Sequence, residues 1–149
     1  MGWTLRAVAA VTAAGALLGA GSAEAAIRLT PRGTFIFTPG TRAKVWAVVP
    51  GRIYRFSVDY EVGGARRIAT EHVFGITRTT TRERLAVFAR SFRAAPPGVF
   101  NEAQTFQVPS SWQPGVYRFS WALTARAPGQ PPVTTRGARS FLVVPKPAR

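Results

Sequence analysis

The chain contains no cysteine, one histidine, and six acidic residues against 20 lysines and arginines. Without cysteine, no disulfide can staple the fold and no thiolate can hold a metal ion. One histidine and six carboxylates provide too few ligands to suggest a zinc or copper centre. The sequence therefore predicts a domain that is stabilised by packing alone, with no cofactor and no metal.

Long apolar runs are missing beyond the amino terminus. Residues 1–25 hold Arg6, an uncharged run rich in Ala and Gly, and then Ala23-Glu24-Ala25. This order is typical of a Sec-type signal peptide with cleavage after Ala25. The run is short and weakly apolar for a membrane span. We therefore expect a secreted or periplasmic protein whose mature part, 26–149, is a single domain without a transmembrane span. The sequence leaves open whether the leader is cleaved or retained.

Two stretches, 50–62 and 114–125, both begin with Pro-Gly and continue with Tyr-Arg-Phe-Ser. In the first, Tyr54, Phe56 and Val58 alternate with polar or charged residues, and in the second Tyr117 and Phe119 do the same. A period of two is the pattern of a half-buried strand. The residues before the two Pro-Gly pairs do not match, so we interpret the likeness as one packing solution used twice and not as a repeat.

Shorter β-branched or aromatic runs predict further strands at 34–38, 44–49, 67–79, 104–108 and 139–144, and Gly63-Gly64 is typical of a hairpin turn.

Residues 81–93 fit two patterns. Thr80 and Glu83 have the spacing of a capping box, and Phe88 and Phe92 then share one helical face. The same segment alternates as a strand through Leu85, Val87 and Ala89. Seven or eight short strands without a long helix predict an all-β, two-sheet sandwich, with one short helix over about 81–93 as the open alternative.

The last third of the chain resembles immunoglobulin-like or fibronectin-like domains of bacterial secreted proteins. The resemblance rests on FQVPSSWQPGVYRFSWALTA, at 106–125, and on RSFLVV, at 139–144. It implies that Trp112 caps the core, that Tyr117 forms a tyrosine corner with upstream backbone, and that Phe141 and Val143 line the last strand. The cysteine pair that joins the two sheets in many such domains is absent. No functional residue follows from this likeness, because the architecture hosts unrelated activities.

No catalytic constellation is evident, and we predict that the protein is not an enzyme. His72 stands beside Glu71 in a predicted strand, where neighbours face opposite sides, and we expect a histidine at the surface or rim. Asp59 and Glu61 lie on one strand face as the nearest pair of carboxylates. We expect them to pair with arginines such as Arg66 or Arg118 and not to act as acid and base.

Charge is the one functional clue with a pattern along the chain. Residues 26–58 and 103–149 each carry six basic residues and no acidic one, whereas 59–102 holds five acidic residues. The first and last strands of such a sandwich commonly lie together, which would merge the two acid-free ends into one positive flank. Solubility alone is an equally open explanation for this charge. The residues predicted to bind a polyanion are Arg42, Lys44, Arg118, Arg126, Arg136 and Arg139.

The expected partner is an anionic polymer of a bacterial envelope, with contact to an acidic lipid surface as a related option. Nucleic acid is disfavoured, because alternation places the aromatic rings inside the core, where bases cannot stack on them. The rival prediction is a protein-recognition module, such as a peptidase inhibitor or an assembly subunit. It would bind another envelope protein through the Pro-rich loops 94–98 and 127–132.

Overall fold

The computed structural model describes residues 24–64 and 67–148, and in this part of the chain it contains eight strands and no helix. The predicted leader, 1–25, lies almost wholly outside the described residues. The strands are β1 (Arg28–Phe37), β2 (Ala47–Val48), β3 (Ile53–Gly63), β4 (Ile68–Arg78), β5 (Arg84–Ala95), β6 (Gly98–Gln107), β7 (Gly115–Arg126) and β8 (Val133–Val143).

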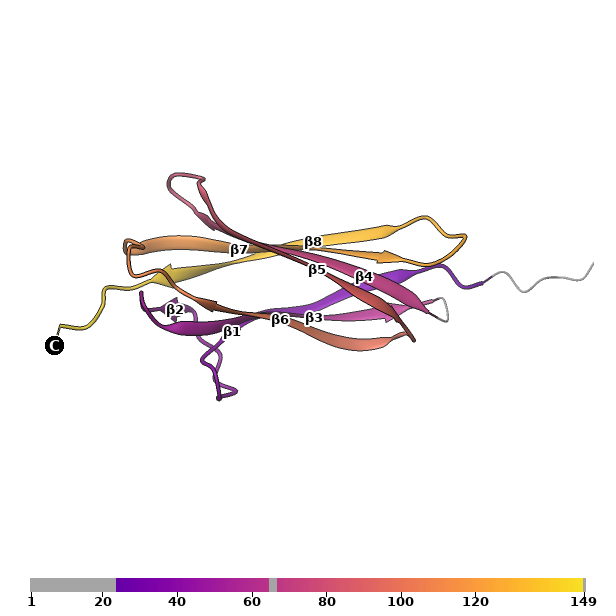
Figure 1. Cartoon of the computed structure of the whole chain (residues 1–149), viewed down its shortest axis with the longest axis horizontal. Coiled ribbons are helices and arrows are strands. Elements are labelled where there is room, and N and C mark those ends of the chain that lie inside the picture. The colour runs from indigo at the N-terminus through magenta and orange to yellow at the C-terminus, as the bar shows by residue number, and fades with distance from the viewer. Residues whose placement is uncertain (1–23, 65–66, 149) are drawn as a thin grey trace, which may run out of the picture.

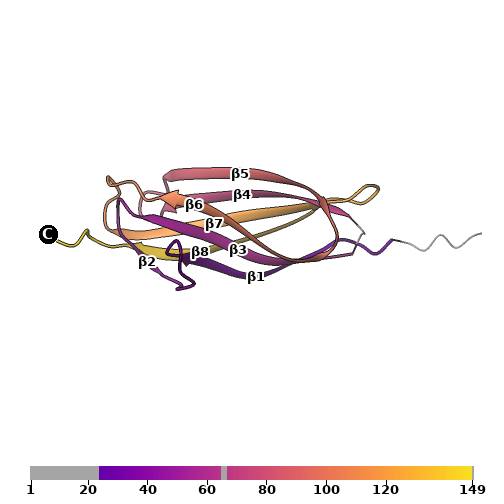
Figure 2. The same ribbon diagram turned by 60° about the horizontal axis from the view of Figure 1, so that its bottom comes forward.

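The strands form two stacked sheets, so the predicted immunoglobulin-like β-sandwich is confirmed (Figure 1). The small sheet has the order β1-β3-β6, and the large sheet has the order β2-β8-β7-β4-β5. All pairings are antiparallel except the short one between β2 and β8. The sandwich is elongated, and the two ends of the described chain lie at opposite ends of it (Figures 1 and 2).

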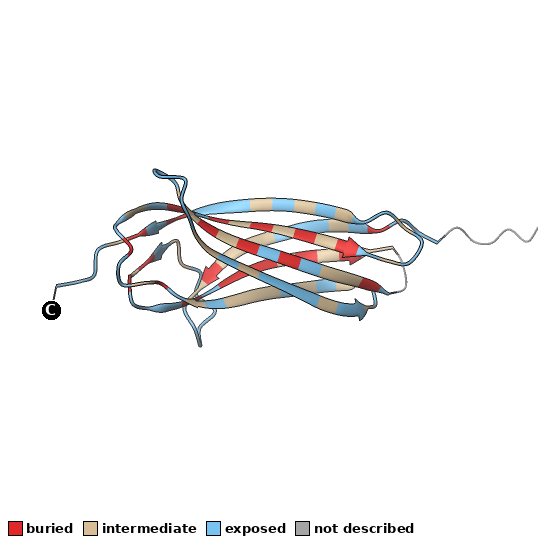
Figure 3. Ribbon diagram, turned by 45° about the horizontal axis from the view of Figure 1, so that its top comes forward, coloured by how far each residue is buried: buried red, intermediate tan, exposed pale blue. Residues whose placement is uncertain are grey.

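The core lies between the sheets and consists of the residues that the alternation selects. Tyr54, Phe56, Val58, Tyr60 and Val62 of β3 are all buried, and so are the matching residues of β7 from Tyr117 to Ala125 (Figure 3). Their rings pack edge to face, as between Phe56 and Phe119, whose centroids are 5.2 Å apart. This geometry is the one that aromatic quadrupoles favour.

The two Tyr-Arg-Phe-Ser stretches solve the same local problem. A turn at Pro50-Gly51 precedes β3, with Gly51 at φ +83° and the amide of Arg52 donating to the carbonyl of Val49. Proline and a positive-φ glycine at the two central positions are what a type II turn requires. Each buried tyrosine then bonds backbone beside its turn: the Tyr54 hydroxyl accepts from the amide of Val49 at 2.9 Å, and the Tyr117 hydroxyl donates to the carbonyl of Gln113 at 2.8 Å.

The second of these bonds is the predicted tyrosine corner. Trp112 stacks on Tyr117, with ring centroids 4.9 Å apart, and Phe141 and Val143 are buried on the inner face of β8. All three expectations from the immunoglobulin-like resemblance are therefore met by the structure.

The helical alternative over 81–93 is wrong, because Arg84–Ala95 is a strand that pairs with β4. Thr81 and Glu83 belong to the turn between them, in which Arg82 has φ +57°. The sequence pattern suggested a strand whose apolar face included Val87 and Ala89. In the structure these two residues face solvent, and Phe88 and Phe92 face the core instead. Residues four apart share a face in both a helix and a strand, which is why the two rings fitted both patterns.

The predicted hairpin at Gly63-Gly64 is also wrong. Strands β3 and β4 belong to different sheets, so they do not pair as the two arms of a hairpin. Gly64 has φ +110°, and a Cβ there would lie 2.3 Å from the carbonyl oxygen of Ala26. The glycine is needed for this close passage of the amino-terminal segment and not for a hairpin turn.

Candidate functional site

The outer face of the large sheet contains a shallow hollow of about 570 Å³ that is walled by three arginines. We call it the arginine hollow. Arg84 comes from β5, Arg118 from β7 and Arg136 from β8, and all three side chains are exposed. Alternation along these strands points the side chains away from the core, so the hollow is built on a rigid sheet face.

The floor of the arginine hollow is formed by small side chains. Gly75 of β4, Ser120 of β7 and Ala138 of β8 lie side by side across the sheet. Val87 of β5 closes the same row and is half exposed. Because these residues offer little bulk, the backbone of the central strands is accessible between the longer arginine side chains.

No acidic residue lines the arginine hollow. Within the described part of the chain, none of its three arginines forms an ion pair. Arg118 and Arg136 are separated by four residues' length of β7, roughly 13 Å, because Arg136 lies beside Ala122. The hollow therefore presents spaced, uncompensated positive charges to solvent.

The structure brings only two of the six predicted polyanion-binding residues, Arg118 and Arg136, into this hollow. Arg126 lies on the outer face of β7 but at its far end, 3.9 Å from Glu71.

The remaining three predicted residues lie around the segment that joins β1 to β2. Arg42 is exposed in that segment, Lys44 Nζ lies 3.9 Å above the ring of Phe35, and the guanidinium of Arg139 lies 3.5 Å above the ring of Trp46. Here β1 and β8 lie side by side across one edge of the sandwich. Close by, Trp121 Nε1 of β7 donates to Thr34 Oγ1 of β1 at 2.8 Å. These three residues form a second basic group, the edge group.

Sequence reasoning missed Arg84. Arg84 lies in the middle segment of mixed charge. Ile76 of β4 pairs with Ala86 of β5, but the next residue, Thr77, pairs with Arg84, and this bulge in the pairing places Arg84 on the outer face. No pattern in the sequence alone indicates that bulge.

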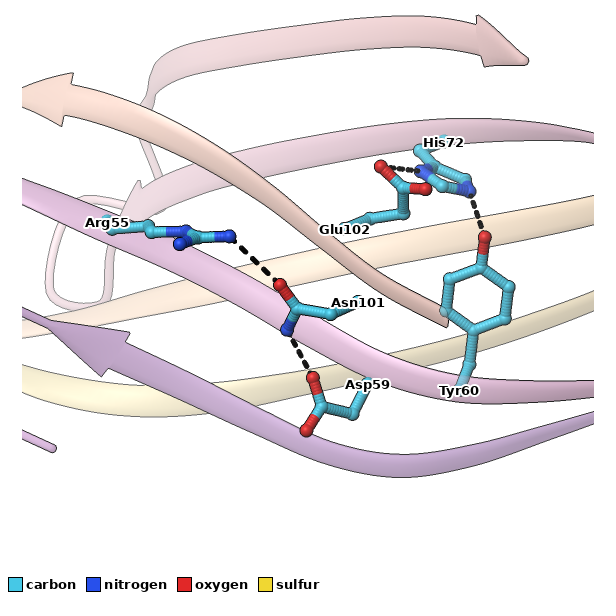
Figure 4. Close-up of polar contacts among 6 residues, drawn as sticks. All are labelled: Arg55, Asp59, Tyr60, His72, Asn101 and Glu102. Atoms are coloured by element: carbon cyan, nitrogen blue, oxygen red, sulfur yellow. Dashed lines mark hydrogen bonds and ion pairs between the residues drawn. The ribbon is translucent and has the colours of Figure 1, made fainter. Parts of the chain in front are cut away.

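A buried polar cluster lies on the other side of the large sheet, between β3, β4, β5 and β6 (Figure 4). His72 Nε2 is 3.1 Å from the Tyr60 hydroxyl, and His72 Nδ1 is 3.8 Å from the Glu102 carboxylate. The expectation of a surface histidine is wrong, because His72 is only 2% exposed. The signal was present: His72 shares its strand parity with Ile68, Phe74 and Ile76.

Burial shifts the pKa values of all three members towards their neutral forms. It lowers the pKa of His72 to about 4 and raises the pKa of Tyr60 to about 12. Burial also raises the pKa of Glu102, against the opposing effect of the Arg90 guanidinium. These are the directions expected when charged forms lose their contact with water.

The cluster has the order hydroxyl, imidazole and carboxylate that many nucleophilic enzymes use. An activated nucleophile, however, needs an environment that eases loss of its proton. Here the pKa of Tyr60 moves the other way, so its hydroxyl keeps the proton. The arrangement instead supplies hydrogen-bond partners to polar groups buried between the two sheets.

Asp59 and Glu61 lie on the outer face of the small sheet and do not face one another as an acid–base pair. Asn101 bridges Arg55 and Asp59 (Figure 4). Glu61 pairs with Arg32 of the neighbouring strand β1. Cross-strand pairing is therefore what the structure shows, with other partners than those expected. Arg118 lies on the opposite sheet, and Arg66 lies outside the described residues.

The two Pro-rich loops lie at the same end of the sandwich (Figure 1). Strands β5 and β7 both run antiparallel to β4, so the loops that follow them emerge together. Gln130 ties the second loop to the start of the described chain, where it accepts from the amide of Ile27 at 3.1 Å.

Two further observations concern residues 24–64 and 67–148. Within them, no three His, Asp or Glu side chains gather in a way that could hold a metal ion. The same residues contain no helix of the length and apolarity that a membrane crossing requires.

Neither a protein-family model nor a curated protein sequence matches this chain. Solved structures do match it. The C-terminal domain of Wzt aligns over 83% of this chain and 80% of its own, with 10% identity and a TM-score of 0.53. A CARDB domain from Pyrococcus furiosus also aligns, with 12% identity, over 83% of this chain and 90% of its own, with a TM-score of 0.44. A PapD-like domain of human CEP192 aligns with 12% identity over 83% of this chain and 89% of its own, with a TM-score of 0.45. The alignment with the Wzt domain, at 10% identity, shows a shared fold and nothing about function.

Proposed function

We propose that this protein is an exported, non-enzymatic binding module of a bacterial envelope or cell exterior, which captures an anionic surface polymer in the arginine hollow. The observation that carries the proposal is the hollow itself. Three exposed arginines from three strands surround a floor of small residues, and no acidic side chain lines it. Export and a bacterial source rest on the predicted leader and on the arginine-rich composition.

Arginine suits this task because its planar guanidinium binds carboxylate and phosphate groups through paired hydrogen bonds. A linear polymer with repeated negative charges could contact Arg118 and Arg136 at the same time, across their spacing of roughly 13 Å. The excess of positive charge over the chain, +14, would draw such a polymer towards the surface. The edge group of Arg42, Lys44 and Arg139 offers further contacts to a long polymer.

The test uses polygalacturonate and polyphosphate as carboxylate and phosphate probes, and neutral dextran as the uncharged control. The variant carries Arg118→Glu with Arg136→Glu. The matched control carries Arg28→Glu with Arg52→Glu, which are exposed residues outside the hollow with the same change in net charge. We expect binding to one or both polyanions, with affinity falling steeply between about 20 and 150 mM salt.

The hollow variant should lose at least about tenfold in affinity, and the control variant should change by less than about threefold. An equal loss in both variants would show that net charge alone binds the polymer and would reject the hollow. Binding that is insensitive to salt, or no binding to either polyanion, would reject the proposal as a whole.

A second candidate function is recognition of another envelope protein through loops 94–98 and 127–132. The observation that favours it is the emergence of both loops at one end of the sandwich (Figure 1). Stiff loops on a rigid scaffold lose little entropy on binding. Replacement of both loops by Gly-Ser segments should abolish such recognition and leave polyanion binding unchanged.

A further inference from the structure

Strand β5 is an open edge of the large sheet. It contains 12 residues, pairs with β4 on one side, and pairs with no strand of the described chain on the other. Its outward backbone amides and carbonyls therefore have no strand partner in the described chain and can bond with another strand. Near its end, the carbonyl of Ala94 accepts from the Arg67 guanidinium at 3.0 Å. Natural edge strands are commonly short, kinked or interrupted by proline. The opposite edge of the same sheet, β2, is short, with only two residues. Strand β5 is long and contains no proline.

The inner side of this edge is incompletely covered. Neither β5 nor its counterpart β6 contains a buried residue, in contrast to β3 and β7 (Figure 3). Phe88 and Phe106 close the gap between the two strands at one point, with ring centroids 5.4 Å apart. Further along, a cavity of about 210 Å³ lies between Phe92 and Phe100 and is lined mainly by apolar side chains. An added strand could place an apolar side chain there.

The charge of β5 indicates which kind of strand would fit. Its charged residues are Arg84, Arg90 and Arg93, and it has no acidic residue. Pairing of β5 with β5 of a second copy would bring arginines together, and like charges that face one another across strands are destabilising. A strand with acidic residues would instead meet a complementary edge.

We propose that β5 accepts an extended, acidic segment of a partner protein as a sixth strand of the large sheet. The backbone of the added strand would bond to the free edge of β5. Its alternate side chains would divide between the apolar cavity beside Phe92 and the guanidinium of Arg93, the residue that follows Phe92 in β5. This mode gives affinity through main-chain bonds and selectivity through alternate side chains. It does not depend on the arginine hollow.

The test uses a defined library of eight-residue peptides that alternate Asp or Glu with Val, Leu, Ile or Phe. A library with Lys in place of the acidic residues is the charge-reversed control. The best acidic peptide is also made with N-methyl groups on alternate residues, in both registers, and each version lacks the amide donors along one edge of the peptide strand. Binding is measured by fluorescence anisotropy, and the binding edge is located by amide hydrogen exchange.

We expect acidic peptides to bind, Lys peptides not to bind, and N-methylation in one register to lower affinity at least tenfold. Hydrogen exchange should slow in β5 and not in β1. The variant Ser91→Glu with Arg93→Glu should lose at least tenfold. Arg28→Glu with Thr30→Glu, which makes the same charge change on the edge strand β1, should stay within twofold. Absence of peptide binding, indifference to N-methylation in both registers, or protection outside β5 would each overturn the proposal.

Discussion

At the scale of single residues, His72 illustrates how burial and charge compete inside the sandwich. The side chain is almost fully enclosed, its Nε2 is bonded to Tyr60, and the carboxylate of Glu102 is 3.8 Å from its other ring nitrogen. A carboxylate at that distance favours the imidazolium form, but loss of water opposes it more strongly. The pKa of His72 falls to about 4 as a result.

This depressed pKa makes the free energy of unfolding dependent on pH. In the unfolded chain the histidine takes up a proton near pH 6.5, whereas in the folded chain it stays neutral down to about pH 4. The unfolded state therefore binds more protons between these values, and stability falls as the pH falls through this window. At about pH 4, His72 alone lowers the free energy of unfolding by about 3 kcal/mol relative to neutral pH. The raised pKa of Glu102 acts in the opposite direction, because the folded state takes up that proton first.

We predict that His72→Gln removes most of this loss. Glutamine can still bond to Tyr60 but does not titrate. Between pH 7 and pH 4.5, the variant should lose about 2 to 3 kcal/mol less of its free energy of unfolding than the original protein. Urea unfolding at the two pH values measures the difference. Parallel losses in the two proteins would show that His72 does not sense the pH.

Residue patterns predicted some side chains of the site and missed others for physical reasons. The Tyr117 corner was predictable, since a buried phenol needs a partner and the Pro-Gly turn places backbone beside it. His72 was predictable in principle from its parity with Phe74. Glu102 and Arg90 were not, because their closeness depends on how two separate sheets stack, and no local pattern carries that information.

At the scale of elements, the sequence predicted the central strands better than their neighbours. Strands β3 and β7 have apolar residues at every second position over most of their length. The first eight residues of β8, VTTRGARS, include almost no apolar side chain, and they are extended because β7 provides a partner along them. The start of β1 is similar, with Pro31 beside a bulge. A neighbour, and not local preference, determines the structure of such segments.

The link between β3 and β4 provides a prediction at this scale. Gly64 and Gly40 both have positive φ, but a Cβ at Gly64 would lie 2.3 Å from the Ala26 carbonyl oxygen, whereas no atom lies within 4 Å of one at Gly40. Gly40→Ala should therefore lower the free energy of unfolding by about 1 kcal/mol, from backbone strain alone. Gly64→Ala should cost at least about 2 kcal/mol more, because backbone atoms must move. Chemical denaturation measures both, and equal losses would contradict the close approach of the Ala26 carbonyl to Gly64.

At the scale of the whole molecule, the basic residues of the two acid-free ends of the sequence, 26–58 and 103–149, lie in several separate places of the folded domain. The first and last long strands, β1 and β8, do lie side by side, as a single positive flank would require, but they belong to different sheets. The basic residues consequently separate into the arginine hollow on one face, the edge group beside β1 and β8, and Arg126 at the far end of β7. The hollow itself is completed by Arg84, a residue from the segment of mixed charge.

The same imbalance predicts how the whole domain responds to salt without any ligand. With 20 basic and six acidic residues, repulsion within the folded chain exceeds attraction, and folding brings the like charges closer together. Sodium chloride screens this repulsion, so its addition from about 10 to 300 mM should raise the melting temperature by roughly 2–5 °C. The variant Arg118→Glu with Arg136→Glu lowers the net charge by four and should respond less. Differential scanning calorimetry at several salt concentrations measures both.

A melting temperature that falls with added salt would mean that specific ion pairs such as Arg32–Glu61 outweigh the general repulsion. The positive charge would then be balanced in the folded state, and little of it would be left to hold an anionic polymer.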